Sequence, residues 1–331
     1  MKLTPTRLLV LGICLVMLAG TVPGLMQSPA VAGPRVMKPG DDGGGSGGSG
    51  PALENVLIRA DKPYTDVVAA INAAGGSVSR TYNNFDGIAA SIPRSAIRTI
   101  GTLTGPERIS KDLIVPAPTP KGVAGKTTGL QRVGSATQAA YESATAIAAA
   151  DFAGFAASHP DAYLTNNAST HVNALHAAGY AGQGMVVGII DSGIRPGFPH
   201  LGLDGSVIGC EDFVGDAFGC SHVNNSGHGT FVAGMVSANV NFTFNPAGFT
   251  FQAIAANLPG AVIGVSTVPM IGSAPLSSIY AFRVFPPTGG AATSDILAAM
   301  DRAIELRELY EDGDPAGVKI SVVNMSLGGP T

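Results

Sequence analysis

The stretch GMVVGIID, residues 184–191, decides the fold. It is a continuous apolar run that ends in an acid, which is the pattern of a strand buried on both faces of a parallel sheet. Similar runs at 277–285 (SSIYAFRVF) and 319–327 (KISVVNMSL) alternate with helical patterns at 231–238 and 293–310. This alternation predicts an α/β fold with a mostly parallel sheet for residues 166–331.

Residues 54–115 have a different pattern, in which short strands and helices alternate. A helix is expected to begin with Thr65 as its N-cap and to have Gly75 just past its end. A second helix is expected to begin at Pro93. The predicted strands are 55–60, 77–82, 87–92 and 108–115. The order β-α-β-β-α-β predicts a small α+β sandwich.

The composition limits the functional class. The chain has 331 residues, of which 45% are hydrophobic and 13% charged, and its net charge is −4. No long basic run occurs, so we expect no nucleic-acid partner.

The N-terminal residues have the pattern of a secretory signal. Lys2 and Arg7 precede an apolar run, Leu8–Ala19, and the small residues Ala30–Ala32 offer a cleavage site. Residues 1–32 are therefore predicted to be a signal peptide, with an uncleaved membrane anchor as the alternative. We expect a secreted protein, extracellular or periplasmic, that is monomeric and has no membrane contact after cleavage.

Two segments have the composition of linkers. Residues 33–53 are rich in glycine and serine, and residues 116–165 are rich in alanine, proline and glycine. Such segments have little to bury. Part of the second, residues 136–150, has the composition of a helix.

Cys210 and Cys220 lie close together in the segment CEDFVGDAFGC. An exported chain meets an oxidising compartment, so a disulfide between them is predicted, with two free thiols as the alternative.

The segment SGHGTFVAG, residues 226–234, contains the candidate general base, His228. A histidine base needs a carboxylate that orients the ring and stabilises its charged form. Asp191 ends a predicted strand, at the sheet edge where functional groups gather, although an aspartate that caps a turn is the alternative. A zinc site would need a second ligand at helical spacing from His228, where Phe231 and Val232 stand.

Three motifs, VVGIIDSGI (186–194), SGHGTFVAG (226–234) and VVNMSLGG (322–329), resemble in order and approximate spacing those of the subtilisin-like serine proteases. The resemblance implies a mostly parallel subtilisin-like sheet with flanking helices, incomplete here, preceded by a small α+β ferredoxin-like propeptide domain at 54–115. It implies that polypeptides are the substrates and that the chain's own propeptide is an inhibitory partner.

The same resemblance assigns roles to individual residues. Asp191 would be the acid of a catalytic triad and His228 its base. A substrate-binding strand would contain Ser326, Leu327 and Gly328, and would face a second strand at 288–294 that includes Gly289 and Gly290. Activity should then rise from mildly acidic to neutral or alkaline pH, because the base must be neutral.

The chain also departs from the family pattern. His200 stands where the family often has an aspartate that helps to bind calcium, so calcium is not supported, and no metal or cofactor is expected. The segment between residues 239 and 272 is longer than usual, and residues 241–251 (NFTFNPAGFTF) predict an extra surface hairpin. The oxyanion asparagine and the Gly-Thr-Ser nucleophile motif of the family would follow Thr331. Ser192 and Ser326 are poor substitutes, so we expect a truncated precursor that is inactive as it stands.

Two other classes stay open. One is a catalytically inactive, secreted binding or inhibitory protein derived from a protease. The other is a secreted metal-binding protein that uses His222, His228 and Asp191. A nucleophile motif encoded downstream of residue 331 would favour the protease over both.

Overall fold

The structure is a computed structural model that describes residues 52–118, 141–162, 167, 169–195, 205–220 and 227–328. The predicted signal peptide, most of the glycine-rich linker, His200 and His222 lie outside the described residues. None of the helices in the described ranges combines the length and the apolar character that a membrane crossing requires.

A four-stranded parallel sheet forms the centre of the larger unit. Its strand order is β13-β7-β11-β8, and every neighbouring pair is parallel. The strands are β7 (Val186–Asp191), β8 (Val207–Asp212), β11 (Ser278–Arg283) and β13 (Ile320–Asn324). The prediction of a mostly parallel sheet with flanking helices is confirmed. β8 was not predicted, because its residues are only partly buried and its sequence, VIGCED, ends in two acids.

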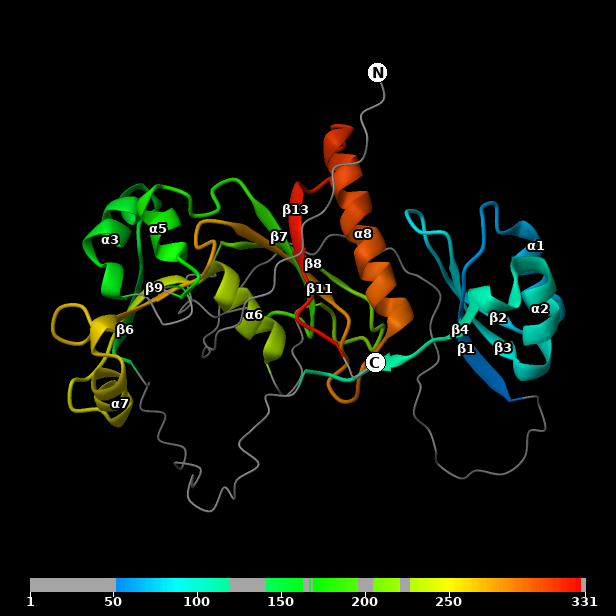
Figure 1. The fold of residues 1–331 in the computed structure, drawn as a ribbon, viewed down its shortest axis with the longest axis horizontal. Helices are drawn as coiled ribbons and strands as arrows, with labels where there is room; N and C mark the ends of the chain where they lie inside the picture. The colour runs from blue at the N-terminus through cyan, green and yellow to red at the C-terminus, as the bar shows by residue number, and fades with distance from the viewer. Residues whose placement is uncertain are drawn as a thin grey trace, which may run out of the picture.

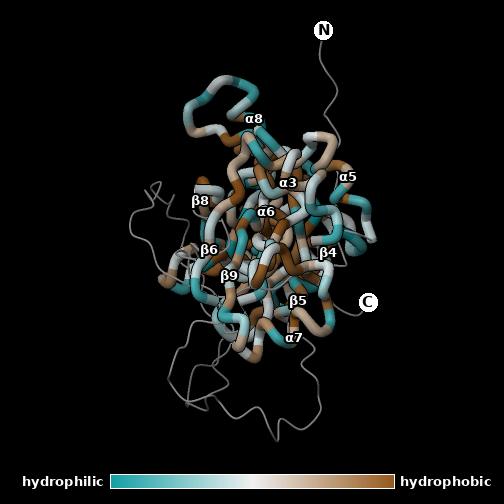
Figure 2. The backbone as a smooth tube through the Cα atoms, turned by 90° about the vertical axis from the view of Figure 1, so that its left-hand side faces the viewer, coloured by the Kyte–Doolittle hydropathy of each residue, from teal (hydrophilic) through white to brown (hydrophobic). Residues whose placement is uncertain are grey.

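Two helices cover the faces of this sheet, and strand alternation supplies both with apolar partners. On one face, Ile189 and Ala281 pack in a core with Val232 of α6 (His228–Ser237). On the other face, Ile190 and Phe282 pack in a core with residues of α8 (Thr293–Glu311). Figure 1 shows α8 lying next to the sheet. Hydrophobic segments gather in the interior of the chain trace, and hydrophilic ones lie mainly on its outer turns (Figure 2).

A second, antiparallel sheet lies at the end of the molecule that carries α3, α5 and α7 (Figure 1). Its order is β10-β9-β6. The elements of this region are β6 (Ser143–Ala146), α3 (Phe152–Ser158), α5 (Val172–Ala177), β9 (Asn239–Thr243), α7 (Phe249–Asn257) and β10 (Thr267–Ile271).

This region corrects two expectations from the sequence. The predicted hairpin at 241–251 is wrong, because β9 pairs with β10 and helix α7 lies between them. Phe251 and Ile254, three residues apart on α7, pack against the core beneath the helix, which favours helix over strand. Within residues 136–150, the predicted helical part of the linker, residues 143–146 instead form β6 on the free edge of β9.

The smaller unit has the predicted β-α-β-β-α-β order. Its sheet, β2-β3-β1-β4, is antiparallel, and its core contains Ile71, Ile88, Ile92 and Ile100. Its elements are β1 (Leu53–Ile58), α1 (Thr65–Ala73), β2 (Ser77–Thr81), β3 (Ile88–Pro93), α2 (Ile97–Thr104) and β4 (Ile109–Lys111).

Two details of this unit differ from prediction. Thr65 is the first residue of α1 rather than its N-cap; Tyr64 occupies the cap position, and no side chain caps the helix. The predicted last strand divides in two, because the chain leaves the small sheet after Lys111. The second piece, β5 (Ile114–Val115), pairs antiparallel with β12 (Ala291–Ala292) of the larger unit.

Candidate active site

Asp191 lies at the carboxyl end of β7 and is 1% exposed. A carboxylate so buried needs partners. Ser192 donates its backbone N–H to Oδ1 at 2.7 Å, which fixes the carboxylate just where the strand ends. The remaining acceptor capacity of the carboxylate faces His228.

His228 is the first residue of α6. Its Nδ1 lies 2.9 Å from Oδ2 and 3.0 Å from Oδ1 of Asp191, and its side chain is 15% exposed. Donation from Nδ1 to the carboxylate leaves Nε2 of the neutral ring as the nitrogen that can accept a proton. The structure therefore brings together the two residues that the sequence paired.

The glycines around His228 have separate physical roles. Gly227 has φ 62°, a left-handed conformation that favours glycine, and it is the N-cap of α6. A Cβ on Gly229 would overlap the carbonyl oxygen of Gly193 and would lie 3.2 Å from the Cβ of Asp191. The close approach of the α6 N-terminus to the end of β7 therefore requires glycine at 229.

Two serines near the site have their hydroxyl groups engaged. Ser192 is fully buried, and its Oγ accepts a hydrogen bond from the backbone N–H of Gly229 at 3.0 Å. Ser326 Oγ donates to Oδ1 of Asn324 at 2.8 Å. The first bond ties the turn after β7 to the N-terminus of α6.

The residues predicted to bind substrate lie at two places. Ser326, Leu327 and Gly328 follow β13 as irregular backbone, whereas Gly289 and Gly290 lead into β12. The antiparallel partner of β12 is β5, with Val115 opposite Ala291. A Cβ on Gly290 would overlap the carbonyl oxygen of Val115.

Residues from both places pack against one core. Val115, Ala117 and Leu327 all pack against the core that contains Ala291. The segment after β4 therefore occupies the edge where a peptide was expected to pair.

The smaller unit is also held on α8, through aspartates that the sequence did not single out. Asp301, 8% exposed, accepts hydrogen bonds from the backbone N–H groups of Asn83 at 2.8 Å and Asn84 at 2.6 Å. Asp295 accepts from Arg80, and burial raises the pKa of Asp295 although Arg80 opposes the shift.

The N-terminal end of α8 contributes two further contacts. Asp112 accepts from the N–H of Ser294 at 3.0 Å and from its hydroxyl at 2.6 Å. Tyr82 donates its hydroxyl to the carbonyl oxygen of Ser294 at 3.1 Å, and burial raises its pKa. A carboxylate at a helix N-terminus also interacts favourably with the helix dipole.

A buried ionic cluster, missed from the sequence, adjoins Asp191. Arg283 ends β11, is 0% exposed, and donates from Nη1 to Asp212 at 2.8 Å and to Asp216 at 2.8 Å, and from Nη2 to Asp216 at 2.7 Å. Burial alone would lower the pKa of Arg283, but the two carboxylates raise it. An arginine inside the apolar run IYAFRVF was the available signal, because a buried charge needs partners.

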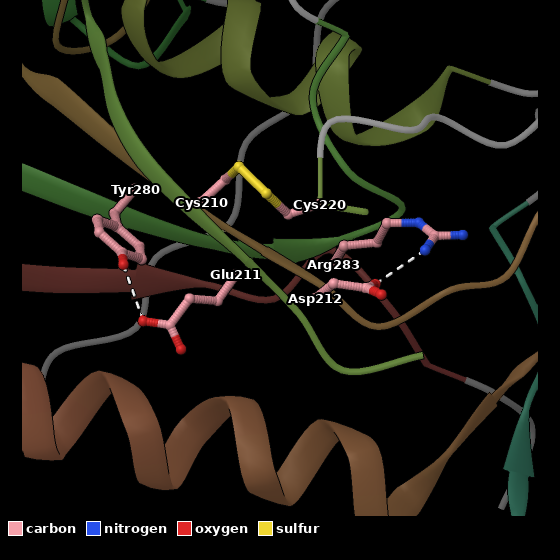
Figure 3. Close-up of a disulfide and its surroundings, with 6 residues drawn as sticks. All are labelled: Cys210, Glu211, Asp212, Cys220, Tyr280 and Arg283. Carbon is pink, nitrogen blue, oxygen red and sulfur yellow. Dashed lines mark hydrogen bonds and ion pairs between the residues drawn. A yellow bond between two sulfur atoms is a disulfide. The ribbon is translucent and has the colours of Figure 1, made fainter. Parts of the chain in front are cut away.

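Cys210 and Cys220 are joined by a disulfide with Cα atoms 5.6 Å apart, and the bridge spans the segment that carries Asp212 and Asp216 (Figure 3). On the opposite face of β8, Glu211 accepts from the hydroxyl of Tyr280 at 2.8 Å. Figure 3 shows Glu211 pointing toward α8 and Asp212 toward Arg283.

Within the ranges that the structure describes, no group of three or more His, Cys, Asp or Glu side chains is arranged to hold a metal ion. The contact of His228 with Asp191 offers the chemistry of a histidine base oriented by a buried carboxylate.

A family model described as the subtilase family matches residues 182–331, which include Asp191, His228 and the strands around them. Residues 182–331 are therefore similar to the subtilase family. The subtilase segment thus begins shortly before β7 and leaves the smaller unit outside the match.

Part of this chain is also similar in sequence to known subtilisins. Subtilisin of Bacillus pumilus is 31% identical over 162 residues, covering 48% of this chain and 42% of that protein. Subtilisin E of Bacillus subtilis (strain 168) is 31% identical over 162 residues, covering 48% of this chain and 30% of that protein. The matched part thus spans less than half the length of these relatives.

A crystal structure of an epidermin leader peptide processing serine protease from Staphylococcus aureus aligns with 83% of this chain and 50% of its own. The TM-score is 0.43 and the identity 14%, which is too low for a comparison of folds.

Proposed function

We propose that this chain is the N-terminal part of a secreted subtilisin-like serine endopeptidase precursor, in which Asp191 and His228 are the acid and base of an Asp-His-Ser triad. The observation that carries the proposal is the contact of His228 Nδ1 with both carboxylate oxygens of Asp191, at 2.9 and 3.0 Å, inside a subtilase segment.

In the proposed reaction His228 accepts the proton of a serine hydroxyl as that oxygen attacks a peptide carbonyl, and later gives the proton to the leaving amine. Asp191 holds the ring so that Nε2 is the accepting nitrogen, and stabilises the imidazolium that forms. Its burial supports this role, because an ion pair strengthens where water is excluded.

The smaller unit, residues 54–115, is proposed to be an inhibitory propeptide. Its β5 pairs with β12, where a substrate peptide would add a strand, and Val115 and Ala117 pack against the same core as Leu327. The acidic groups Asp295 and Asp301 of α8 hold the unit at this position. In this proposal the propeptide prevents cleavage by filling the peptide-binding edge.

The remaining parts of the proposal rest on sequence. Residues 1–32 are the signal peptide that directs export, and the disulfide between Cys210 and Cys220 suits an oxidising compartment. The serine nucleophile and the oxyanion asparagine are proposed to follow Thr331, so that residues 1–331 alone do not form an acyl-enzyme.

The test begins with the coding sequence downstream of codon 331. The encoded chain should supply a serine nucleophile, and its product should hydrolyse casein and react with a fluorophosphonate probe. His228→Ala and Asp191→Asn should reduce turnover by at least about a thousandfold each, in line with the loss of a triad member. Full casein hydrolysis by His228→Ala would exclude the proposed base.

A binding protein without catalysis is the competing function. An immediate stop codon after Thr331, together with inhibition of a related intact subtilisin by residues 54–118, would favour it. A downstream nucleophile and labelling by the probe would exclude it.

A further inference from the structure

We propose that Arg283 is a positioning residue for the Asp191–His228 pair: it clamps the disulfide-closed segment 210–220 to the sheet edge that carries Asp191. The inference rests on the proposed function only in treating Asp191 and His228 as catalytic residues. The contacts of Arg283 with Asp212 and Asp216 do not depend on that function.

Arg283 and Asp191 are direct neighbours. The two residues are in register on the parallel strands β11 and β7, and the N–H of Val284 donates to the carbonyl oxygen of Asp191 at 2.9 Å. Neighbouring residues in register point their side chains to the same face of a sheet. Both side chains therefore lie on the face covered by α6, the helix that begins with His228.

On its other side Arg283 is bonded to the end of β8 and to the loop that follows. The N–H of Phe213 donates to the carbonyl oxygen of Arg283 at 2.9 Å, and the guanidinium reaches Asp212 and Asp216. Arg283 thus joins the end of β11 to β8 and its loop by both backbone and side chain, and the next residue, Val284, joins β11 to the end of β7.

The charge balance explains why the clamp is strong. The Asp212 and Asp216 side chains are only 18% and 13% exposed, and Arg283 is 0% exposed. Removing the guanidinium would leave the two poorly hydrated carboxylates without their cation, so the loop would have to move outward to hydrate them.

The disulfide limits where such a loop can go. Cys220 lies eight residues before His228, and the bridge to Cys210 keeps it beside β8. Movement of Asp216 away from the sheet is therefore confined to the span between Cys210 and Cys220, and it releases the end of β11 from that segment. The disturbance reaches Asp191 through the neighbouring Val284, whose N–H bonds to the Asp191 carbonyl oxygen. The expected consequence is a looser contact between His228 and Asp191.

The test observes this contact directly, by NMR of the full chain. The proton on His228 Nδ1, donated to a buried carboxylate, should give a downfield signal that exchanges slowly with water, assigned by its loss in His228→Ala. In Arg283→Met the exchange rate should rise at least about tenfold. Arg283→Lys keeps the charge but loses the bidentate fork, and should give an intermediate rate.

Arg307→Met is the matched control. Arg307 is also ion-paired, to Glu311 of the same helix, and it donates to the carbonyl oxygen of Ile320 at the start of β13, so these partners lie outside segment 210–220. Its loss should leave the signal of the His228 proton unchanged. An equal effect of Arg307→Met and Arg283→Met would reduce Arg283 to a general contributor to stability.

Unchanged exchange in a folded Arg283→Met would overturn the proposal. If that variant does not fold, Asp216→Asn is the deciding variant, because it keeps the contact between Arg283 and Asp212. The His228 Nδ1 proton should then exchange at least threefold faster than in the parent chain. An unchanged exchange rate would refute the clamp. These readouts do not depend on peptide hydrolysis. Failure of the protease proposal, seen as full activity of His228→Ala in the extended chain, therefore remains a separate result.

Discussion

Replacement of Asp301 by alanine should detach the smaller unit from α8. The carboxylate accepts two backbone hydrogen bonds, from Asn83 at 2.8 Å and Asn84 at 2.6 Å, and each bond to a charged group contributes about 1.5–3 kcal/mol. Part of this gain is offset in the native chain, because a carboxylate that is 8% exposed has lost most of its hydration. A net loss of about 2–4 kcal/mol remains, which raises the detached population roughly 30- to 1,000-fold.

Hydrogen exchange of the full chain measures this detachment at amides that do not touch Asp301. The N–H groups of Thr293 and Ser294 donate to Leu113 and Asp112 of the smaller unit, so their protection requires docking. Their exchange should accelerate by the stated factor in Asp301→Ala. Asp312→Ala, which removes an exposed carboxylate just past the C-terminal end of the same helix, should not accelerate it. Unchanged exchange at both amides in Asp301→Ala would refute the reasoning that the carboxylate holds the unit in place.

Three further outcomes are expected. Gly290→Ala should displace β5 from β12, because the new methyl group would overlap the carbonyl oxygen of Val115, and loss of protection at the β5 amides would show it. His176 lies in α5 and is 0% exposed, and burial lowers its pKa, so the unfolded state takes up a proton that the folded state resists. The free energy of unfolding should fall as the pH drops below about 6.5, by at most ~1.4 kcal/mol per pH unit, and His176→Gln should remove this slope in denaturant titrations. The double variant Cys210→Ser/Cys220→Ser should lose about 3 kcal/mol of stability, through the freedom returned to the unfolded loop, and a thermal midpoint equal to that of the parent would contradict this.

Local pattern explains which features could be predicted from the sequence. Asp191 ends an apolar strand and His228 stands in a glycine-flanked motif, so each is visible within ten residues of sequence. Their contact followed from the tendency of parallel strands to present functional groups at one edge. The main helices and the four strands of the small sheet were visible for the same reason, since their hydrophobic periods are regular.

Features that depend on distant partners could not be predicted in this way. Asp295 and Asp301 have the pattern of ordinary surface charges on α8, and their donors lie more than 200 residues earlier in the chain. β9 pairs with β10, which follows only after helix α7, so the pattern of residues 241–251 alone gave a wrong hairpin prediction. Arg283 is the exception, because a charge inside an apolar run is a local signal that a buried ion pair is needed.

The helix that begins with His228 is itself part of the hydrophobic core. Eight of its residues are buried, among them Val232 and Ala233 at 0% exposure, so α6 is bound to the sheet along nearly its whole length. In the unsubstituted chain, where Arg283 still holds segment 210–220, the backbone of His228 therefore cannot move away from Asp191 unless α6 moves with it. On heating, the contact between the two residues should persist up to the temperature at which the core melts and should vanish in that same transition. The Asp191–His228 contact and the fold of the domain should therefore be lost at the same temperature, with no intermediate in which the domain is folded and the two residues are apart.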